Sequence, residues 1–141
     1  MSLFSSSEEE NIRKAVEAAE AKTSGEIRVC VEKRCPENTL DRAANYFAKL
    51  GMDKTALRNG VLIYLATEDR KFAIIGDAGI NKVVPENFWD ETKQEMLQRF
   101  KEGNLAEGIV TGIRMAGEKL KIFFPAQDGD VNELSDDISY M

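Results

Sequence analysis

Histidine is absent from this 141-residue sequence, and cysteine occurs only twice. Without histidine the chain lacks the commonest general base at neutral pH and cannot form the Ser–His or Cys–His pairs that activate a nucleophile. Cys30 and Cys35 are not spaced as CxxC, so a zinc site of the usual kind is not expected. We expect Cys30 to be a small buried residue of a strand and Cys35 to be a loop thiol.

The sequence also lacks long hydrophobic runs and an excess of basic residues. Its longest uninterrupted apolar stretch, 61–66, is too short to cross a bilayer. The N-terminal residues lack the basic and apolar regions of a signal peptide. The net charge is −6, and no basic stripe is visible in the sequence. We therefore expect a cytoplasmic protein that binds neither membranes nor nucleic acid.

The composition divides the chain into a domain and a tail. Hydrophobic residues make up 43% of the sequence, enough for one packed core at this length. Residues 1–124 are nearly neutral and are expected to form a single, monomeric domain. Residues 125–141 contain five acidic residues and no basic one, which predicts a flexible acidic tail. The alternative is a short motif containing Ile138 and Tyr140 that docks on a partner or on its own domain.

The periodicity of apolar residues predicts an alternation of helices and strands. Helical spacing covers 7–22, 38–50, a segment opened by Pro85 that ends near Gly103, and 105–123. Runs typical of strands cover 26–33, 61–66 and 71–75. The first two strands are joined through a helix and should be parallel, whereas the last two form an antiparallel hairpin. This predicts an α/β fold, a three-layer α/β/α sandwich with a mixed sheet and helices on both faces.

These strand directions gather polar residues at one end of the sheet. The strands at 26–33 and 61–66 begin there and the strand at 71–75 ends there, so Glu26, Asn59 and Asp77 should lie close together. Such oxygen ligands suit calcium or magnesium. The alternative is that both acids are solvated or cap nearby backbone, with Asp77 as a turn residue. The neighbours expected to line the same cleft are Ser24, Gly25, Arg58, Gly60, Gly76 and Gly79.

The opposite end of the sheet carries the charged hairpin turn. Asp69 and Arg70 lie in this turn and are secondary candidates for a functional role. A turn rich in charge is usually just solvated, and an exposed pair there contributes about 0–1 kcal/mol.

The hairpin, NGVLIYLATEDRKFAIIGDAGI, together with TSGEIRV upstream, resembles the TPM domain family. The similarity covers about residues 7–122, and the ending PxxDxxxNELxDDIS is similar to that of stand-alone bacterial members. The resemblance implies an α/β/α sandwich, calcium binding in an acidic cleft and acid phosphatase activity. Other members assist the assembly or repair of protein complexes.

Taken together, the residues and the resemblance predict a divalent-cation-binding module that engages a protein partner. The alternative is a metal-assisted acid phosphatase acting on small phosphoesters, in which Asp77 or Glu26 would act as the base. No nucleophile is evident in the sequence, so no catalytic residue is assigned.

Overall fold

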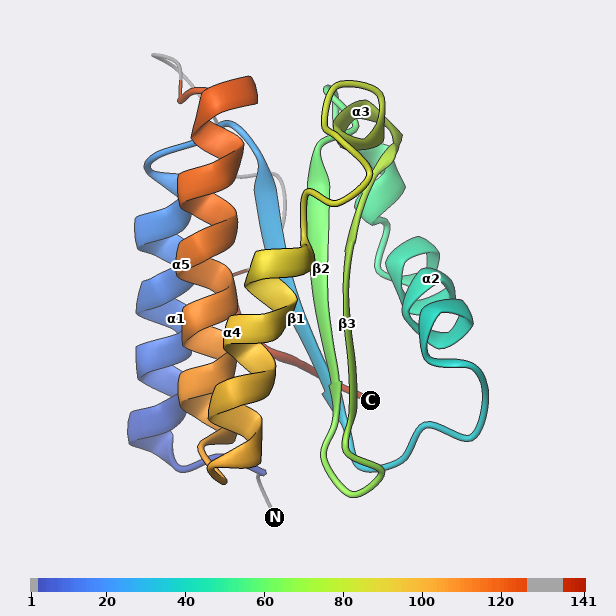
Figure 1. Ribbon diagram of the computed structural model, residues 1–141, viewed down its shortest axis with the longest axis vertical. Helices are drawn as coiled ribbons and strands as arrows, with labels where there is room; N and C mark the ends of the chain where they lie inside the picture. Colours follow the sequence, from blue (N-terminus) through green and yellow to red (C-terminus); the bar gives the residue numbers. More distant parts are fainter. Residues whose placement is uncertain (1–2, 127–135) are drawn as a thin grey trace.

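The computed structural model describes residues 3–126 and 136–141. A sheet forms the middle layer and helices cover both of its faces (Figure 1). Helices α1 (Ser6–Glu20), α4 (Asp90–Lys101) and α5 (Leu105–Phe123) lie on one face. Helix α2 (Thr39–Lys49) covers the other face, followed by the short 3-10 turn η1 (Met52–Lys54). The predicted three-layer sandwich is confirmed.

The sheet has the strand order β3-β2-β1-β4. Strands β1 (Glu26–Glu32) and β2 (Gly60–Ala66) are parallel, and β3 (Lys71–Gly76) pairs antiparallel with β2. The short helix α3 (Ala78–Asn81) follows β3 at the end of the sheet where β1 and β2 begin. The chain directions predicted from the sequence are therefore correct.

Two apolar layers flank the sheet because side chains alternate between its faces. Ile27, Val29 and Val31 of β1 pack into the core shared with α1, α4 and α5. Cys30 of the same strand joins the smaller core beneath α2, where Cys35 is also buried. Strand β2 is buried along its whole length, as expected for a central strand covered on both faces. None of the described helices is long and apolar enough to cross a membrane.

Local signals account for the ends and contacts of the helices. Ser5 and Glu8 form a reciprocal capping box that begins α1, with hydrogen bonds of 2.9 and 3.1 Å. Helices α4 and α5 approach closely at Gly112, where an added Cβ would lie 2.6 Å from the sulfur of Met96. The helix expected from Pro85 begins only at Asp90, because 85–89 form turns that bury Phe88 and Trp89.

The last residues of the tail expected over 125–141 follow the alternative expectation and pack on their own domain. Ser139 and Tyr140 form the strand β4, which pairs parallel with Cys30 and Val31 of β1. The amide of Met141 also donates to the carbonyl of Val31 at 3.0 Å. Part of the rest of this tail, residues 127–135, lies outside the described residues. The last residues thus dock on their own domain, where backbone pairing and burial of Ile138 offset the loss of chain entropy.

Candidate functional site

The end of the sheet where β1 and β2 begin brings together the residues predicted to form a site. Glu26 lies opposite Gly60, and Val61 lies opposite Gly76. The amide of Asp77 donates to the carbonyl of Gly60 at 2.9 Å. Glu26, Asn59 and Asp77 therefore share one end of the sheet, although their role as ligands stays a prediction.

A close backbone contact joins the loop before β2 to the start of α3. The amide of Gly79 donates to the carbonyl of Arg58 at 2.8 Å. A Cβ at position 79 would lie 2.3 Å from the carbonyl oxygen of Leu57 and 2.5 Å from that of Arg58. Only glycine fits this approach, which explains its presence there.

Asp77 is held on several sides. Its two carboxylate oxygens accept hydrogen bonds of 2.7 and 2.8 Å from the guanidinium of Arg58. It also caps α3 by accepting from the amide of Ala78 at 2.7 Å. Only 6% of Asp77 is exposed, so the ion pair fills the space in front of the carboxylate. Such two-point pairing leaves little capacity for a further cation.

The remaining predicted residues of this end make structural contacts. The amide nitrogen of Asn59 donates to the hydroxyl of Ser24 at 3.4 Å. The backbone of Gly25 packs against Leu120, and Gly76 packs against the side chain of Ile80. These contacts connect the ends of β1, β2 and β3 to the helices above them.

A second set of carboxylates lies near the beginning of β1. Glu20, in the last turn of α1, accepts the amide of Ile27 at 3.0 Å and shares a hydrogen bond with Asp136. Glu26 is close enough to repel Glu20, and only 5% of Glu26 is exposed. Burial raises the pKa of Glu20 to about 10, with the hydrogen bond and the charge of Asp136 and the charge of Glu26 adding to the rise. Glu20 thus retains its proton at neutral pH.

The geometry does not contain a finished metal site. Among residues 3–126 and 136–141, no three acidic or cysteine side chains are grouped as metal ligands would be. Glu26, Asn59 and Asp77 are neighbours, but Asp77 is committed to Arg58. Glu20 interacts with two other carboxylates of this end, Asp136 and Glu26.

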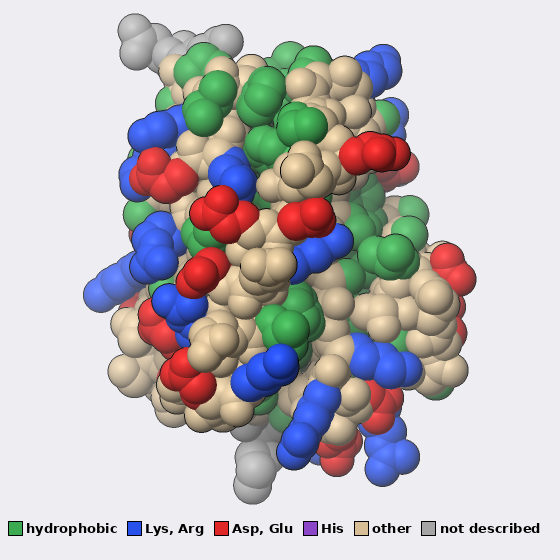
Figure 2. Space-filling view, in the orientation of Figure 1, with side chains coloured by type: hydrophobic (Ala, Val, Ile, Leu, Met, Phe, Trp, Pro, Cys, Tyr) green, Lys and Arg blue, Asp and Glu red, His purple; other side chains and the backbone are tan. Residues whose placement is uncertain are grey.

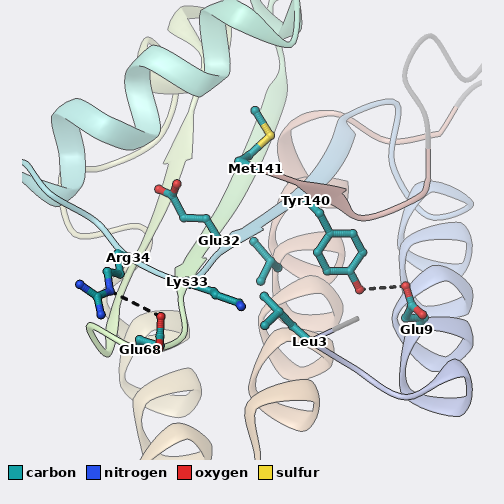
Figure 3. Close-up of a pocket in the computed structure, with 9 residues that line it drawn as sticks. Leu3, Glu9, Glu32, Lys33, Arg34, Glu68, Tyr140 and Met141 are labelled. Carbon is teal, nitrogen blue, oxygen red and sulfur yellow. Dashed lines mark hydrogen bonds and ion pairs between the residues drawn. The ribbon is translucent and has the colours of Figure 1, made fainter. Parts of the chain in front are cut away.

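At the opposite end, where β1 and β4 finish, the surface is hollowed by a cavity of about 750 Å³ (Figure 3). The carboxylates that line it already have partners. Glu9 accepts the hydroxyl of Tyr140 at 2.8 Å, and Glu68 pairs with Arg34 at 3.6 Å. The secondary candidates lie at this same end, and Asp69 accepts the amide of Cys35 at 2.6 Å. Asp69 therefore fixes a loop, while the Arg70 backbone adopts a left-handed φ of 54°.

Glu32, on the wall of this cavity, is the centre of a buried polar cluster. Its carboxylate accepts two hydrogen bonds from Arg42, at 2.8 and 2.9 Å, and one each from the hydroxyls of Tyr46 and Tyr64. Burial opposes ionisation, but these donors outweigh it, so the pKa of Glu32 lies below its usual value. Burial and the adjacent carboxylate raise the pKa of Tyr46 to about 12. A carboxylate satisfied in this way anchors α2 on β1 and is not free for proton transfer.

Comparison with known proteins agrees with this architecture. A profile of the TPM domain matches residues 1–119. The chain belongs to the TPM domain family. The resemblance noted in the hairpin and in the segment before β1 is therefore confirmed, and the match covers most of the described body. None of the curated proteins compared with this TPM domain matches it.

Solved structures of similar proteins extend the comparison. The NMR structure of the BA42 protein from the psychrophilic bacterium Bizionia argentinensis superposes with a TM-score of 0.94 at 46% identity, covering 99% of this TPM domain chain and 97% of BA42. The N-terminal domain of a protein from P. gingivalis has a TM-score of 0.71 at 20% identity, with coverages of 86% and 79%. The N-terminal domain of cg2496 from Corynebacterium glutamicum has a TM-score of 0.67 at 15% identity, with coverages of 96% and 80%. The last two share the fold.

Sequence reasoning missed three features of this TPM domain. The interaction of Glu20 with Glu26 had a signal, because a short connection between α1 and β1 keeps the two carboxylates near each other. The contribution of Asp136 had none, since it depends on the docking of the C-terminal residues. The sequence also carried a signal for the cluster around Glu32, because Glu32 lies on the same face of β1 as the buried Cys30.

Proposed function

We propose that this TPM domain binds a divalent cation, calcium or magnesium, beside the beginning of β1, with the carboxylates of Glu20, Glu26 and Asp136 as ligands. The observation that supports the proposal is that Glu20 of α1 interacts with two other carboxylates, Asp136 through a hydrogen bond and Glu26 of β1 through its charge. Calcium and magnesium both take carboxylate oxygens as ligands. The calcium binding implied by the family resemblance points to the same chemistry.

Electrostatics supports an ion at this position. Glu26 is almost fully buried, and burying several like charges is unfavourable unless protons or a cation offset them. The raised pKa of Glu20 means that a proton serves this purpose in the ion-free protein. A divalent ion would replace that proton, and Glu20 and Asp136 would turn from each other toward the ion. The ligand group would be completed only on binding, because no three such side chains are grouped among residues 3–126 and 136–141.

The proposed ligands overlap only in part with those predicted from the sequence. Glu26 is kept, and Asn59 remains a possible neutral oxygen ligand at the same end of the sheet. Asp77 is replaced because Arg58 occupies both of its oxygens. The same ion pair argues against Asp77 as the base of a phosphatase, and no other observation favours hydrolysis over binding.

The position of Asp136 connects the ion to the predicted partner. Asp136 lies just before the residues that form β4 on the edge of β1. A bound ion would tie this segment to the domain, whereas release of the ion would loosen it and expose the edge of β1. We propose that a protein partner engages this region and that the cation controls its access.

The ion site is tested by titrating the full chain with CaCl₂ and, separately, with MgCl₂, followed by NMR of the backbone amides. We expect shifts at residues 20, 26, 27 and 136, and an affinity about tenfold lower in Glu20→Gln and in Glu26→Gln. The matched control is Glu17→Gln, which removes an exposed carboxylate of the same helix that pairs with Arg13. Equal losses in Glu17→Gln, or shifts confined to 58–60 and 76–79, would contradict the assignment.

Partner engagement is tested separately by removing residues 136–141. A binding partner recovered with the full chain in calcium-free buffer should be retained by the truncated chain even when calcium is added. If calcium changes partner binding equally in the full and the truncated chain, the ion does not control the partner's access through this segment.

A further inference from the structure

A second cavity, of about 470 Å³, lies between the β2–β3 hairpin and the end of α4. It lies beside the beginning of edge strand β3, next to the end of α4 at Lys101. Its volume is within the range of small-molecule sites, about 300–1,000 Å³. The cavity is lined by Leu65, Thr67, Arg70, Phe72, Leu97, Phe100, Lys101, Gly103 and Leu105.

The floor of this cavity is apolar and firmly held. The rings of Phe72 and Phe100 meet edge to face at 4.9 Å between centroids. Gly108 of α5 provides the space for Phe100, since a Cβ there would lie 2.3 Å from the ring. Leu97 is 40% exposed on the wall of the cavity. Figure 2 shows hydrophobic side chains open to solvent between α4 and the hairpin, with Lys and Arg side chains below them.

The charged residues of the lining are all basic. Arg70 comes from the hairpin turn and Lys101 from the last turn of α4. The acidic neighbours of Arg70 in the turn are engaged elsewhere, Glu68 with Arg34 and Asp69 with the amide of Cys35. Within residues 3–126 and 136–141, neither Arg70 nor Lys101 forms an ion pair with a carboxylate. The cavity therefore offers two cations beside an apolar floor.

From this arrangement we propose that the cavity binds a small amphipathic carboxylate, with an aromatic-sized apolar body on Phe72 and Phe100 and its anionic group between Arg70 and Lys101. Arg presents a planar fork that matches a carboxylate, and Lys adds a point charge. An apolar body of this size covers the exposed part of Leu97 and the edges of the two rings. The anion also complements a surface that carries no acidic lining residue.

The test uses 1-naphthoate as the probe and the full chain as the receptor, followed by NMR of the backbone amides at about 0.15 M salt. We expect saturable shifts at residues 67, 70, 97, 101, 103 and 105. Arg70→Asn and Lys101→Gln should each weaken binding about three- to fivefold, as for partly exposed ion pairs. Asparagine tolerates the left-handed φ of position 70, so this variant removes the charge without adding strain. Leu97→Gln should weaken binding without unfolding the chain, because this side chain is largely exposed.

The controls separate the charge from the apolar surface. The neutral analogue 1-naphthylmethanol should bind at least about fivefold more weakly than 1-naphthoate. Lys71→Gln removes an exposed cation of the same hairpin that does not line the cavity, and it should leave the affinity unchanged. Equal binding of the neutral analogue, an equal loss in Lys71→Gln, or the absence of saturable shifts would each overturn the proposal.

Discussion

Arg58 donates to both carboxylate oxygens of Asp77, at 2.7 and 2.8 Å, and so joins the loop before β2 to the beginning of α3. Since Arg58 is half exposed, the pair itself contributes modestly, and Asp77 adds a helix cap. We predict that Asp77→Asn lowers the free energy of unfolding by about 1–2 kcal/mol in urea titrations. Calcium affinity should change by less than about twofold, because Asp77 is not a proposed ligand.

A matched control for this variant is Asp90→Asn, which removes an exposed acid at the start of α4. It should alter neither stability nor ion binding beyond error. A large loss of calcium affinity in Asp77→Asn would mean that Asp77 is a ligand and that its ion pair with Arg58 is not purely structural.

Gly79 is the tightest glycine of this end of the sheet. An added methyl group would lie 2.3 Å from the backbone oxygen of Leu57, which cannot move as a flexible side chain could. We predict that Gly79→Ala costs about 2–4 kcal/mol of unfolding free energy, measured by urea denaturation. Lys82→Ala, an exposed substitution at the end of the same short helix, serves as the control and should be nearly neutral. If Gly79→Ala were as stable as the parent protein, the loop before β2 would have to move away from the added methyl group without a loss of unfolding free energy.

The pKa of Glu20 makes stability depend on pH. Because the folded-state pKa is raised from 4.5 to about 10, the folded protein keeps a proton that the unfolded chain releases. This contribution to stability is complete below about pH 4.5 and is lost as the pH rises toward about 10. Glu20→Gln should therefore be more stable than the parent protein by up to about 5 kcal/mol at about pH 8, and similar to it at about pH 4.

The measurement is thermal or urea unfolding across this pH range, with Glu17→Gln as the exposed control in the same helix. Parallel pH profiles for the parent protein and Glu20→Gln would contradict the raised pKa. Calcium should reduce the difference between them at about pH 8, because the ion compensates the charge that the proton otherwise removes.

Glu32 predicts the opposite dependence on pH. Hydrogen bonds from Arg42, Tyr64 and Tyr46 lower its pKa despite burial, so its contribution is present above the ordinary glutamate value of 4.5 and is lost as the pH falls below that. Glu32→Gln should cost about 2–4 kcal/mol at neutral pH, since Arg42 loses its buried partner. The loss should shrink in acid, when the parent carboxylate is protonated. Glu37→Gln, which removes the more exposed partner of Arg42, should cost less than about 1 kcal/mol.

The sequence predicted the parts of this molecule that follow from periodicity and chain direction. A buried run at 61–66 and a helix between two strands suffice to place Glu26 and Asp77 at one end of the sheet. The ion pair of Asp77 with Arg58 could not be predicted. It depends on the left-handed backbone of Arg58, with a φ of 52°, and no local sequence pattern indicates this conformation. The docking of Asp136 was equally hidden, because β4 has only two residues and shows no alternation.

The two-residue strand β4 supports a final prediction about the edge of β1. Its pairing with Cys30 and Val31, and the hydrogen bond from Met141 to Val31, cover backbone groups that would otherwise face solvent. Ile138 adds apolar contact with the main core. Deleting residues 136–141 should lower the free energy of unfolding by about 1–3 kcal/mol and accelerate amide exchange along β1.

Because an uncovered edge pairs readily with other chains, the truncated protein should also self-associate more at high concentration. Tyr140→Phe removes the hydroxyl that donates to Glu9 and keeps the strand, so it should self-associate no more than the parent protein. Unchanged exchange at Val31 after truncation would show that β4 does not protect this edge in solution.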